Sequence, residues 1–238
     1  MQDPIVMNQE SDFSSSGSLL LVHSLFRHLD SEQQNLILHN KITDTFKRGS
    51  IIYEEGHRMK GFYWVQKGIL KIYKTGFDGK EQIIKFAQPG DIIGYRSVIS
   101  SELACTSGEV LEEATLSLIS ADILLELIKT NGDFAVEMMK LTCKELNEAN
   151  DYLTDVAQKT VKERLAEIII HLDESFGRNA DGILKISLTR EELSNIVGTA
   201  TESIIRLLAD FRDRDLIELK GRKIKILDRP GLRSIAGL

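Results

Sequence analysis

The chain has 238 residues, 42% of them hydrophobic, and a formal net charge of −6. That length allows one or two domains, each with a core of its own. Two cysteines exclude a disulfide framework, no apolar run reaches membrane-spanning length, and the N-terminus lacks a secretory signal pattern, so we expect a cytoplasmic protein.

The charge is distributed unevenly along the chain. An acidic protein is at first an unexpected partner for nucleic acid, because carboxylates repel phosphates. From residue 181 to residue 238, however, 11 Lys and Arg residues stand against 9 Asp and Glu residues, a net charge of +2, which leaves −8 for residues 1–180. The positive charge is therefore confined to the C-terminal end, where contact with phosphates is expected.

The N-terminal part contains two kinds of segment. Residues 1–18 are rich in Ser, Asn, Asp and Gln, which predicts a disordered arm. Residues 19–40 predict one or two short helices that pack on the adjoining domain through five leucines: Leu20, Leu21, Leu25, Leu36 and Leu38.

Residues 42–120 predict a β-sandwich or jelly-roll barrel, because short apolar runs alternate there with glycine turns. Gly76 to Gly79 predicts a hairpin turn. Cupin enzymes have a similar barrel, but their metal sites need a close His pair with a Glu and a further His, whereas His57 stands alone here. We therefore expect no metal site, no catalytic residue and no enzyme. The expected strands cover residues 50–53, 61–68, 69–73, 82–86, 91–93 and 114–119.

A short helix is expected at residues 121–129, and a long helix comes next over residues 131–159. The apolar and small residues of the long helix recur at spacings of 4 and 3 from Ala135 onward, which is the 3.5-residue period of a coiled coil. A helix packed on the barrel alone is the alternative, and Met138 and Leu141 favour some contact of that kind. We predict a homodimer seam formed by Met139, Thr142, Leu146, Ala149, Leu153 and Val156.

The C-terminal part begins with two capping boxes. Thr160 with Glu163 starts one helix, and the break before it is a candidate hinge. Thr189 with Glu192 starts a second helix, and Gly198 supplies the left-handed backbone that ends it. Another helix begins directly after Gly198, and its apolar face is formed by Ile204, Leu207, Leu208 and Phe211.

Two short helices joined by a glycine turn form a helix-turn-helix. The alternating runs at residues 216–219 and 223–227, on either side of Lys220-Gly221-Arg222, predict a β-hairpin wing. The C-terminal unit is therefore expected to be a winged helix-turn-helix.

The outward face of the second helix of this motif is where a recognition helix meets base edges. Arg206 could pair with guanine, Glu202 could accept from the cytosine amino group, and Ile205 could touch a thymine methyl. An ordinary surface pair between Glu202 and Arg206 is the alternative. We expect Thr201, Glu202, Ile205 and Arg206 to read bases, and we expect the residues that hold phosphates to be Thr189, Arg190, Thr199, Ser203, Arg222 and Lys223.

The run Leu188-Thr-Arg-Glu-Glu-Leu-x-x-Ile-Val-Gly198 together with Glu202-Ser-x-x-Arg-Leu-Leu resembles the CRP/FNR family of bacterial transcription regulators. Pro89-Gly-Asp-x-x-Gly94 resembles the β-roll sensor domain of that family. The resemblance implies an α+β protein with an N-terminal β-roll, a long dimerisation helix and a C-terminal winged helix-turn-helix. The implied domains are a disordered arm (1–18), a sensor domain (19–130), a dimerisation helix (131–159) and a DNA-binding domain (160–238).

The resemblance also implies the function and the partners. A homodimer would bind double-stranded DNA at an inverted repeat, control transcription and contact RNA polymerase. In cAMP-type members an Arg stands where this chain has Thr201, so one guanine contact would be lost here.

The effector is not implied by the resemblance. Members that bind cAMP carry a Glu directly after the last glycine of the Pro-Gly-Asp motif and an Arg-Ser pair further on; here Tyr95 and Cys105-Thr106 hold these positions, so we expect no tight binding of cAMP or cGMP. Two cysteines exclude a four-thiolate iron–sulfur cluster within one chain. The candidate ligand-pocket residues are Tyr95, Arg96, Cys105, Thr106, Asn150 and Tyr152.

Three kinds of control stay open at this point. No cofactor is predicted, but an unknown small-molecule effector is one alternative. Haem or redox sensing is another, because one His among five could be an axial ligand. The third is a regulator that needs no effector and is controlled by its abundance.

Overall fold

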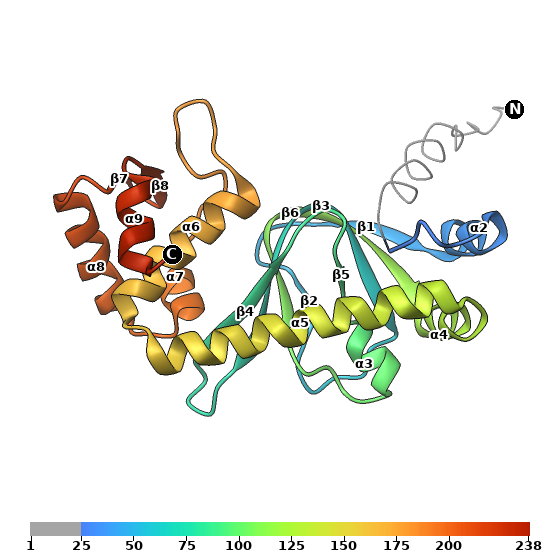
Figure 1. The fold of residues 1–238 in the computed structure, drawn as a ribbon. Helices are drawn as coiled ribbons and strands as arrows, with labels where there is room; N and C mark the ends of the chain where they lie inside the picture. The colour runs from blue at the N-terminus through green and yellow to red at the C-terminus, as the bar shows by residue number, and fades with distance from the viewer. Residues whose placement is uncertain (1–24) are drawn as a thin grey trace, which may run out of the picture. The chain divides into compact units, whose positions relative to one another are not determined.

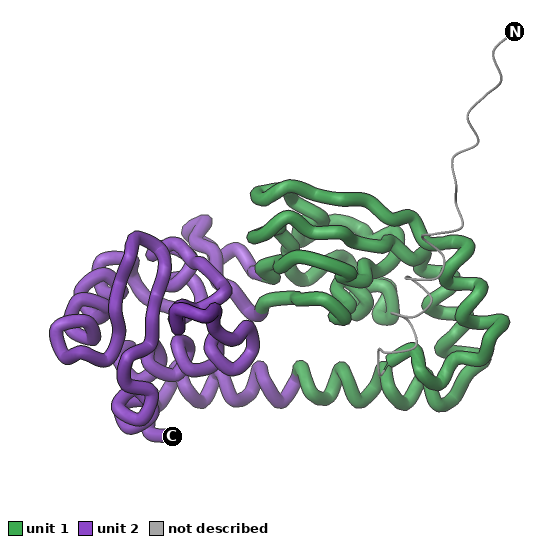
Figure 2. Tube along the Cα trace, turned by 90° about the horizontal axis from the view of Figure 1, so that it is seen from above, with its two compact units in different colours: residues 1–72, 86–145 green, residues 73–85, 146–238 purple. Residues whose placement is uncertain are grey.

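The computed structural model describes residues 25–238, which form two compact units (Figure 1, Figure 2). The first unit contains the described residues up to Ile72 together with Phe86–Glu145, and the second contains Tyr73–Lys85 together with Leu146–Leu238. The expected arm at residues 1–18, with Leu20 and Leu21, lies outside the described residues. Strands dominate the first unit and helices the second, so the predicted α+β class is confirmed.

A six-stranded sheet, in which β1, β6, β3 and β4 are neighbours in that order, makes up most of the first unit, while the parts of β3 and β4 within Tyr73–Lys85 belong to the second unit. The long strand β6 also pairs with β2, and β3 also pairs with β5, in both cases antiparallel. The strands are β1 (Ile42–Phe46), β2 (Ile51–Tyr53), β3 (Gly61–Thr75), β4 (Glu81–Ala87), β5 (Ile92–Ile93) and β6 (Ser107–Ser120).

The strand expected over residues 114–119 is longer than predicted, because β6 begins at Ser107. The strand prediction was wrong in two further places for identifiable reasons. Residues 61–68 and 69–73 form one strand, β3, because Gly68 is a point of close approach rather than a turn: a Cβ there would lie 2.4 Å from the carbonyl oxygen of Glu113 in β6. Strand β1 was missed because it has almost no buried face, so its sequence lacks the alternation that marks a half-buried strand.

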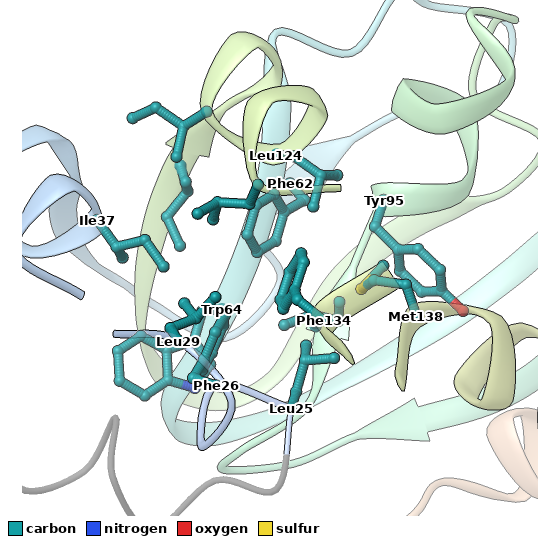
Figure 3. Close-up of a cluster of buried hydrophobic side chains, with 14 of the residues drawn as sticks. Leu25, Phe26, Leu29, Ile37, Phe62, Trp64, Tyr95, Leu124, Phe134 and Met138 are labelled. Carbon is teal, nitrogen blue, oxygen red and sulfur yellow. The ribbon is translucent and has the colours of Figure 1, made fainter. Parts of the chain in front are cut away.

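The first unit has two clusters of buried hydrophobic side chains, and the one drawn in Figure 3 joins helices to the sheet and contains several aromatic rings. The ring of Phe26 meets that of Trp64 edge-on at 5.6 Å and stacks on Phe134 at 6.4 Å. Phe134 and Met138 bring the start of the long helix into this core, so the contact suggested by Met138 is confirmed. The helices of this region are α2 (Ser31–Asn40), α3 (Tyr95–Ser100), α4 (Ala121–Thr130) and α5 (Gly132–Gln158).

The second unit has its own core, and both predicted capping boxes are present in it. Thr160 and Glu163 cap α6, and Thr189 and Glu192 cap α7, each through two reciprocal bonds. The wing is confirmed as an antiparallel pair that turns at Gly221. The elements are α6 (Val161–Phe176), α7 (Arg190–Val197), α8 (Thr201–Asp213), β7 (Ile217–Lys220), β8 (Lys223–Ile226) and α9 (Arg229–Ala236).

Helix α9 was not predicted, although its signals are present. Asp228 caps it by accepting from the backbone N–H of Gly231, and Pro230 lies in its first turn. Leu232 and Ala236 are buried, and α9 packs along α6. The helix closes the core behind the wing, so it belongs to the scaffold of the DNA-binding module. No described helix of either unit has the length and apolarity needed to cross a membrane.

Candidate nucleic-acid interface

The turn between α7 and α8 has the geometry that a helix-turn-helix requires. Gly198 takes left-handed backbone angles (φ 73°, ψ 55°), and its N–H and that of Thr199 both donate to the carbonyl of Ser194. The hydroxyl groups of Ser194 and Thr201 lie 3.0 Å apart and tie the two helices together. The direction of α8 is thus determined within a few residues of the turn.

The N-terminus of α8 is open. Its N-cap residue is Ala200, whose side chain makes no capping hydrogen bond, so backbone N–H groups of the first turn are left to other acceptors. Together with the positive end of the helix dipole, such groups suit a phosphate. Thr199 and Ser203, both half-buried, lie at this end, so their predicted phosphate contacts stay predictions.

The two faces of α8 are clearly separated. Ile204, Leu208 and Phe211 are buried. Glu202, Ile205 and Arg206 are exposed on the other side, whereas Thr201 is half-buried and engaged with Ser194. Within the described residues no ion pair joins Glu202 to Arg206, so the structure does not show the surface pair that was the alternative interpretation.

The candidate phosphate contacts outside α8 lie around the wing. Arg190, at the start of α7, donates from Nη2 to the carbonyl of Gly221 in the wing turn at 3.0 Å. Its Nη1 is buried without a partner among the described residues, and burial lowers the pKa of this guanidinium. Arg222 and Lys223 are exposed beside that turn, while the hydroxyl of Thr189 is occupied in capping α7.

Three of the six candidate pocket residues, Arg96, Cys105 and Thr106, lie near Tyr53, which the sequence did not single out. Its hydroxyl lies 3.3 Å from that of Thr106, and burial raises the pKa of Tyr53 to about 12. The charges of Arg96, Cys105 and Glu145 also act on this hydroxyl.

Arg96 is already neutralised, because its Nε lies 3.3 Å from a carboxylate oxygen of Glu145. Tyr95 is 2% exposed, and its buried hydroxyl has no hydrogen-bond partner of normal geometry among the described residues. Burial, followed by the nearby Glu145 carboxylate, raises the pKa of Tyr95. Figure 3 shows this ring beside Met138, with the hydroxyl pointing out of the apolar cluster.

The other two pocket candidates lie in the second unit. Asn150 is exposed on α5. Tyr152 is half-buried beside the helix-turn-helix, where a Cβ on Gly198 would lie 3.0 Å from its hydroxyl oxygen. Residues 25–238 contain no group of three or more His, Cys, Asp or Glu side chains that could hold a metal ion.

The predicted seam of α5 is a row of exposed apolar side chains. Met139 and Leu146 are each 60% exposed and Leu153 is 65% exposed, while Thr142, Ala149 and Val156 are at least partly exposed between them. Phe134 and Met138, in contrast, are buried in the core of the first unit. An apolar stripe of this length on one helix face is uncommon on a monomer.

Comparison with known proteins identifies both modules. Residues 43–131 match the model of the cyclic nucleotide-binding domain, and residues 163–235 match that of the Crp-like helix-turn-helix domain. The chain is 30% identical over 193 residues to electron transport regulator A of Shewanella oneidensis, a match that covers 80% of this chain and 77% of that protein. The chain belongs to the CRP/FNR family.

Two further similarities agree with this membership. The CRP-like cAMP-activated global transcriptional regulator of Mycobacterium tuberculosis is 27% identical over 185 residues, which cover 77% of this chain and 83% of that protein. A solved CRP/FNR-family structure from Eubacterium rectale has the same fold, with a TM-score of 0.76 at 23% identity over 90% of this chain and 98% of that one. The chain is therefore a CRP/FNR-type DNA-binding transcription regulator, as the sequence predicted.

Proposed function

We propose that this regulator binds an inverted-repeat operator as a homodimer and reads each half-site through the N-terminal part of α8. The observation that carries the proposal is the exposed face of α8, where Glu202, Ile205 and Arg206 stand clear of the core beside an open helix N-terminus. Glu202 and Arg206 have no ion-pair partner among residues 25–238, and such free charged groups are what base edges and phosphates require.

The seam of α5 supports the homodimer. Its members repeat every 3.5 residues and expose Met139, Leu146 and Leu153 by 60% or more. In a symmetric pair the same face meets itself, so the exposed apolar area would become buried on both helices. CRP/FNR regulators act as dimers, and α5 is the element through which we expect this chain to do so.

The effector region supports a regulator that does not respond to cAMP. A cyclic phosphate needs an unpaired cation with convergent donors. Here Cys105 and Thr106 hold the Arg-Ser positions, the Arg96 guanidinium is paired with Glu145, and the hydroxyl of Thr106 is engaged with Tyr53. The buried hydroxyl of Tyr95, which lies near Thr142 and Glu145, is the candidate contact for a different small molecule.

We also propose that the protein contacts RNA polymerase and acts in the cytoplasm. Phe77 lies fully exposed in the turn between β3 and β4, an unusual place for an aromatic side chain unless a partner covers it. Bacterial DNA and RNA polymerase share the cytoplasm, where a regulator of this kind would act.

The deciding experiment is fluorescence anisotropy of the purified, ligand-free protein on DNA from its own promoter region. Binding is measured at two salt concentrations and against random competitor DNA, because phosphate contacts alone give binding that is salt-sensitive but not sequence-specific. Tight binding that resists the competitor supports specific reading by the ligand-free protein, and control by abundance then suffices.

Weak binding that random DNA competes away equally well contradicts specific reading by the ligand-free protein. A colourless preparation would then direct the search to a small molecule, and a coloured one to haem. If selection from a random pool yields no duplex that the protein binds specifically, the operator proposal itself is contradicted.

A further inference from the structure

Arg164 is a buried cation that neither the sequence pattern nor the family comparison singles out. It lies in the first turn of α6 and is 9% exposed. Its Nη1 donates to the carbonyl of Lys159 at 2.8 Å, its Nε to that of Val197 at 3.1 Å, and its Nη2 to that of Gly198 at 3.5 Å. Every acceptor is a backbone carbonyl, and no carboxylate pairs with it among the described residues.

The positions of these carbonyls explain how the charge is tolerated without a carboxylate. Lys159 comes directly after the last residue of α5, and Val197 and Gly198 form the end of α7. The last carbonyls of a helix lack partners within it, and they carry the negative end of its dipole. The guanidinium therefore lies between two helix C-termini, whose partial charges together offset much of its own charge.

The two segments that Arg164 joins have different roles in DNA binding. Lys159 stands at the junction between α5, the proposed dimer helix, and α6. Val197 and Gly198 closely precede α8, the recognition helix. Other contacts hold the same ends: Lys159 Nζ pairs with Asp155 at 2.8 Å and with Glu167 at 2.7 Å, and Tyr152 of α5 lies beside Gly198.

We propose that Arg164 is a positioning residue that fixes the angle of α8 against the end of α5, and so sets the half-site spacing that the dimer requires. The inference rests on the proposed homodimer. Successive half-sites on one face of B-DNA lie about 34 Å apart, so a small rotation of α8 against the dimer axis would misplace both recognition helices. Arginine suits this role because its planar fork reaches two segments at once, whereas a lysine ammonium is a single point of contact.

The three hydrogen bonds of Arg164 to backbone carbonyls are called the clamp below. Amide hydrogen exchange of the DNA-free protein tests this clamp without reference to DNA. We compare Arg164→Lys and Arg164→Met with the wild type and with Lys185→Met, a variant that removes an exposed cation of the same unit away from both helix ends. Exchange should accelerate about tenfold or more in both Arg164 variants, confined to the amides around Lys159–Thr160 and Gly198–Thr201, because the bonds from Arg164 to the carbonyls of Lys159, Val197 and Gly198 oppose local opening of these helix ends. Acceleration spread evenly over α6, α7, α8 and α9 would assign Arg164 to fold stability alone and overturn the proposal.

Half-site spacing tests the consequence for DNA. The probe is a duplex selected by the wild type from a random pool, with its centre lengthened or shortened by one or two base pairs. The wild type should bind the altered duplexes at least about a hundredfold more weakly, since each mispositioned half-site loses its base contacts. Arg164→Lys should bind all the spacings within a few-fold of one another, while keeping its preference for the bases of each half-site.

Arg206→Ala is the matched control, because it should lose preference for one base and keep the preference for spacing. An Arg164→Lys variant with the spacing preference of the wild type would refute the positioning role. If the wild type selects no duplex at all, the proposed operator fails, whereas the exchange experiment still decides whether the clamp exists.

Discussion

The reading face of α8 and the region around Tyr53 use polar side chains in opposite ways. Glu202 and Arg206 are exposed and make no ion pair with each other, whereas Arg96 is paired with Glu145 and Thr106 is engaged with Tyr53. A face with unpaired charges is completed by a partner, while a region whose groups pair with one another is already satisfied. The difference teaches that the recognition helix presents free charged groups to DNA, whereas a phosphate-bearing effector would compete with the Glu145 carboxylate for Arg96.

The largest expected effect comes from the seam on which the reading face depends. Leu146→Asp or Leu153→Asp removes apolar area and places like charges opposite each other in the dimer. We expect the dimer dissociation constant to rise about a hundredfold, from roughly 3 kcal/mol lost at the interface, with operator affinity falling in parallel. Sedimentation measures the dimer and anisotropy the operator. Asn147→Asp, on an exposed position beside the seam, is the control; a Leu146→Asp protein that remains dimeric would show that the seam lies elsewhere.

A base contact should have the next largest effect. Arg206→Ala should cost about 1–3 kcal/mol on the selected site and relax the preference at one base pair, as expected for the loss of a bidentate contact with guanine. Competition with duplexes substituted at each position measures both quantities. Arg212→Ala, which removes a charge paired with Asp213 near the other end of α8, is the control. Equal loss on random DNA would mean that Arg206 holds phosphate and reads no base.

A wing contact should have a smaller and uniform effect. Arg222→Ala should weaken binding to selected and random duplexes alike, by less than about tenfold, and lower the slope of log affinity against log salt by about 1 per chain. Lys129→Ala, which removes one positive charge from an exposed position of α4, should leave that slope unchanged. A sequence-dependent loss in Arg222→Ala would move this residue from the phosphate contacts to the base-reading set.

The smallest expected effect concerns the region around Tyr53, where Arg96 is paired with Glu145. Titration with cAMP in a calorimeter should give no saturable heat, because Cys105 and Thr106 replace the Arg-Ser pair and the Arg96 guanidinium is paired with Glu145. The double variant Cys105→Arg, Thr106→Ser introduces the pair that cAMP-type members carry, and a heat signal in that variant alone would sharpen the comparison. A saturable signal in the wild type at low micromolar cAMP would contradict the prediction that this region does not bind cAMP.

The sequence predicted the elements whose signals are local. Both capping boxes, the turn at Gly198 and the faces of α8 result from short spacings, which is why the winged helix-turn-helix could be identified before its partners were known. The α+β class and the family came from the same motifs. The domain limits at residues 130 and 159 stay predictions, since the two compact units divide within α5, at Glu145.

Features that the sequence could not predict depend on distant partners. Gly68 looks like a turn until the backbone of β6 is seen against it. No sequence motif identifies Tyr53 or Glu145, because their contacts with Thr106 and Arg96 form only in the fold. An arginine in a helix is normally expected on the surface, and only the three carbonyl partners of Arg164 show why it is buried. The base, phosphate, seam and pocket assignments remain predictions for the variants proposed for them.

The exposed stripe of α5 also has a genetic consequence. Since the proposed seam lies on α5 and not on α8, a copy with a damaged α8 would still pair with an intact copy. The mixed dimer would then have only one working recognition helix. With equal amounts of both copies, random pairing would leave only about a quarter of the pairs intact, because two intact chains must meet. Alleles damaged in the recognition helix should therefore be dominant over the wild type, whereas alleles damaged in the seam should be recessive.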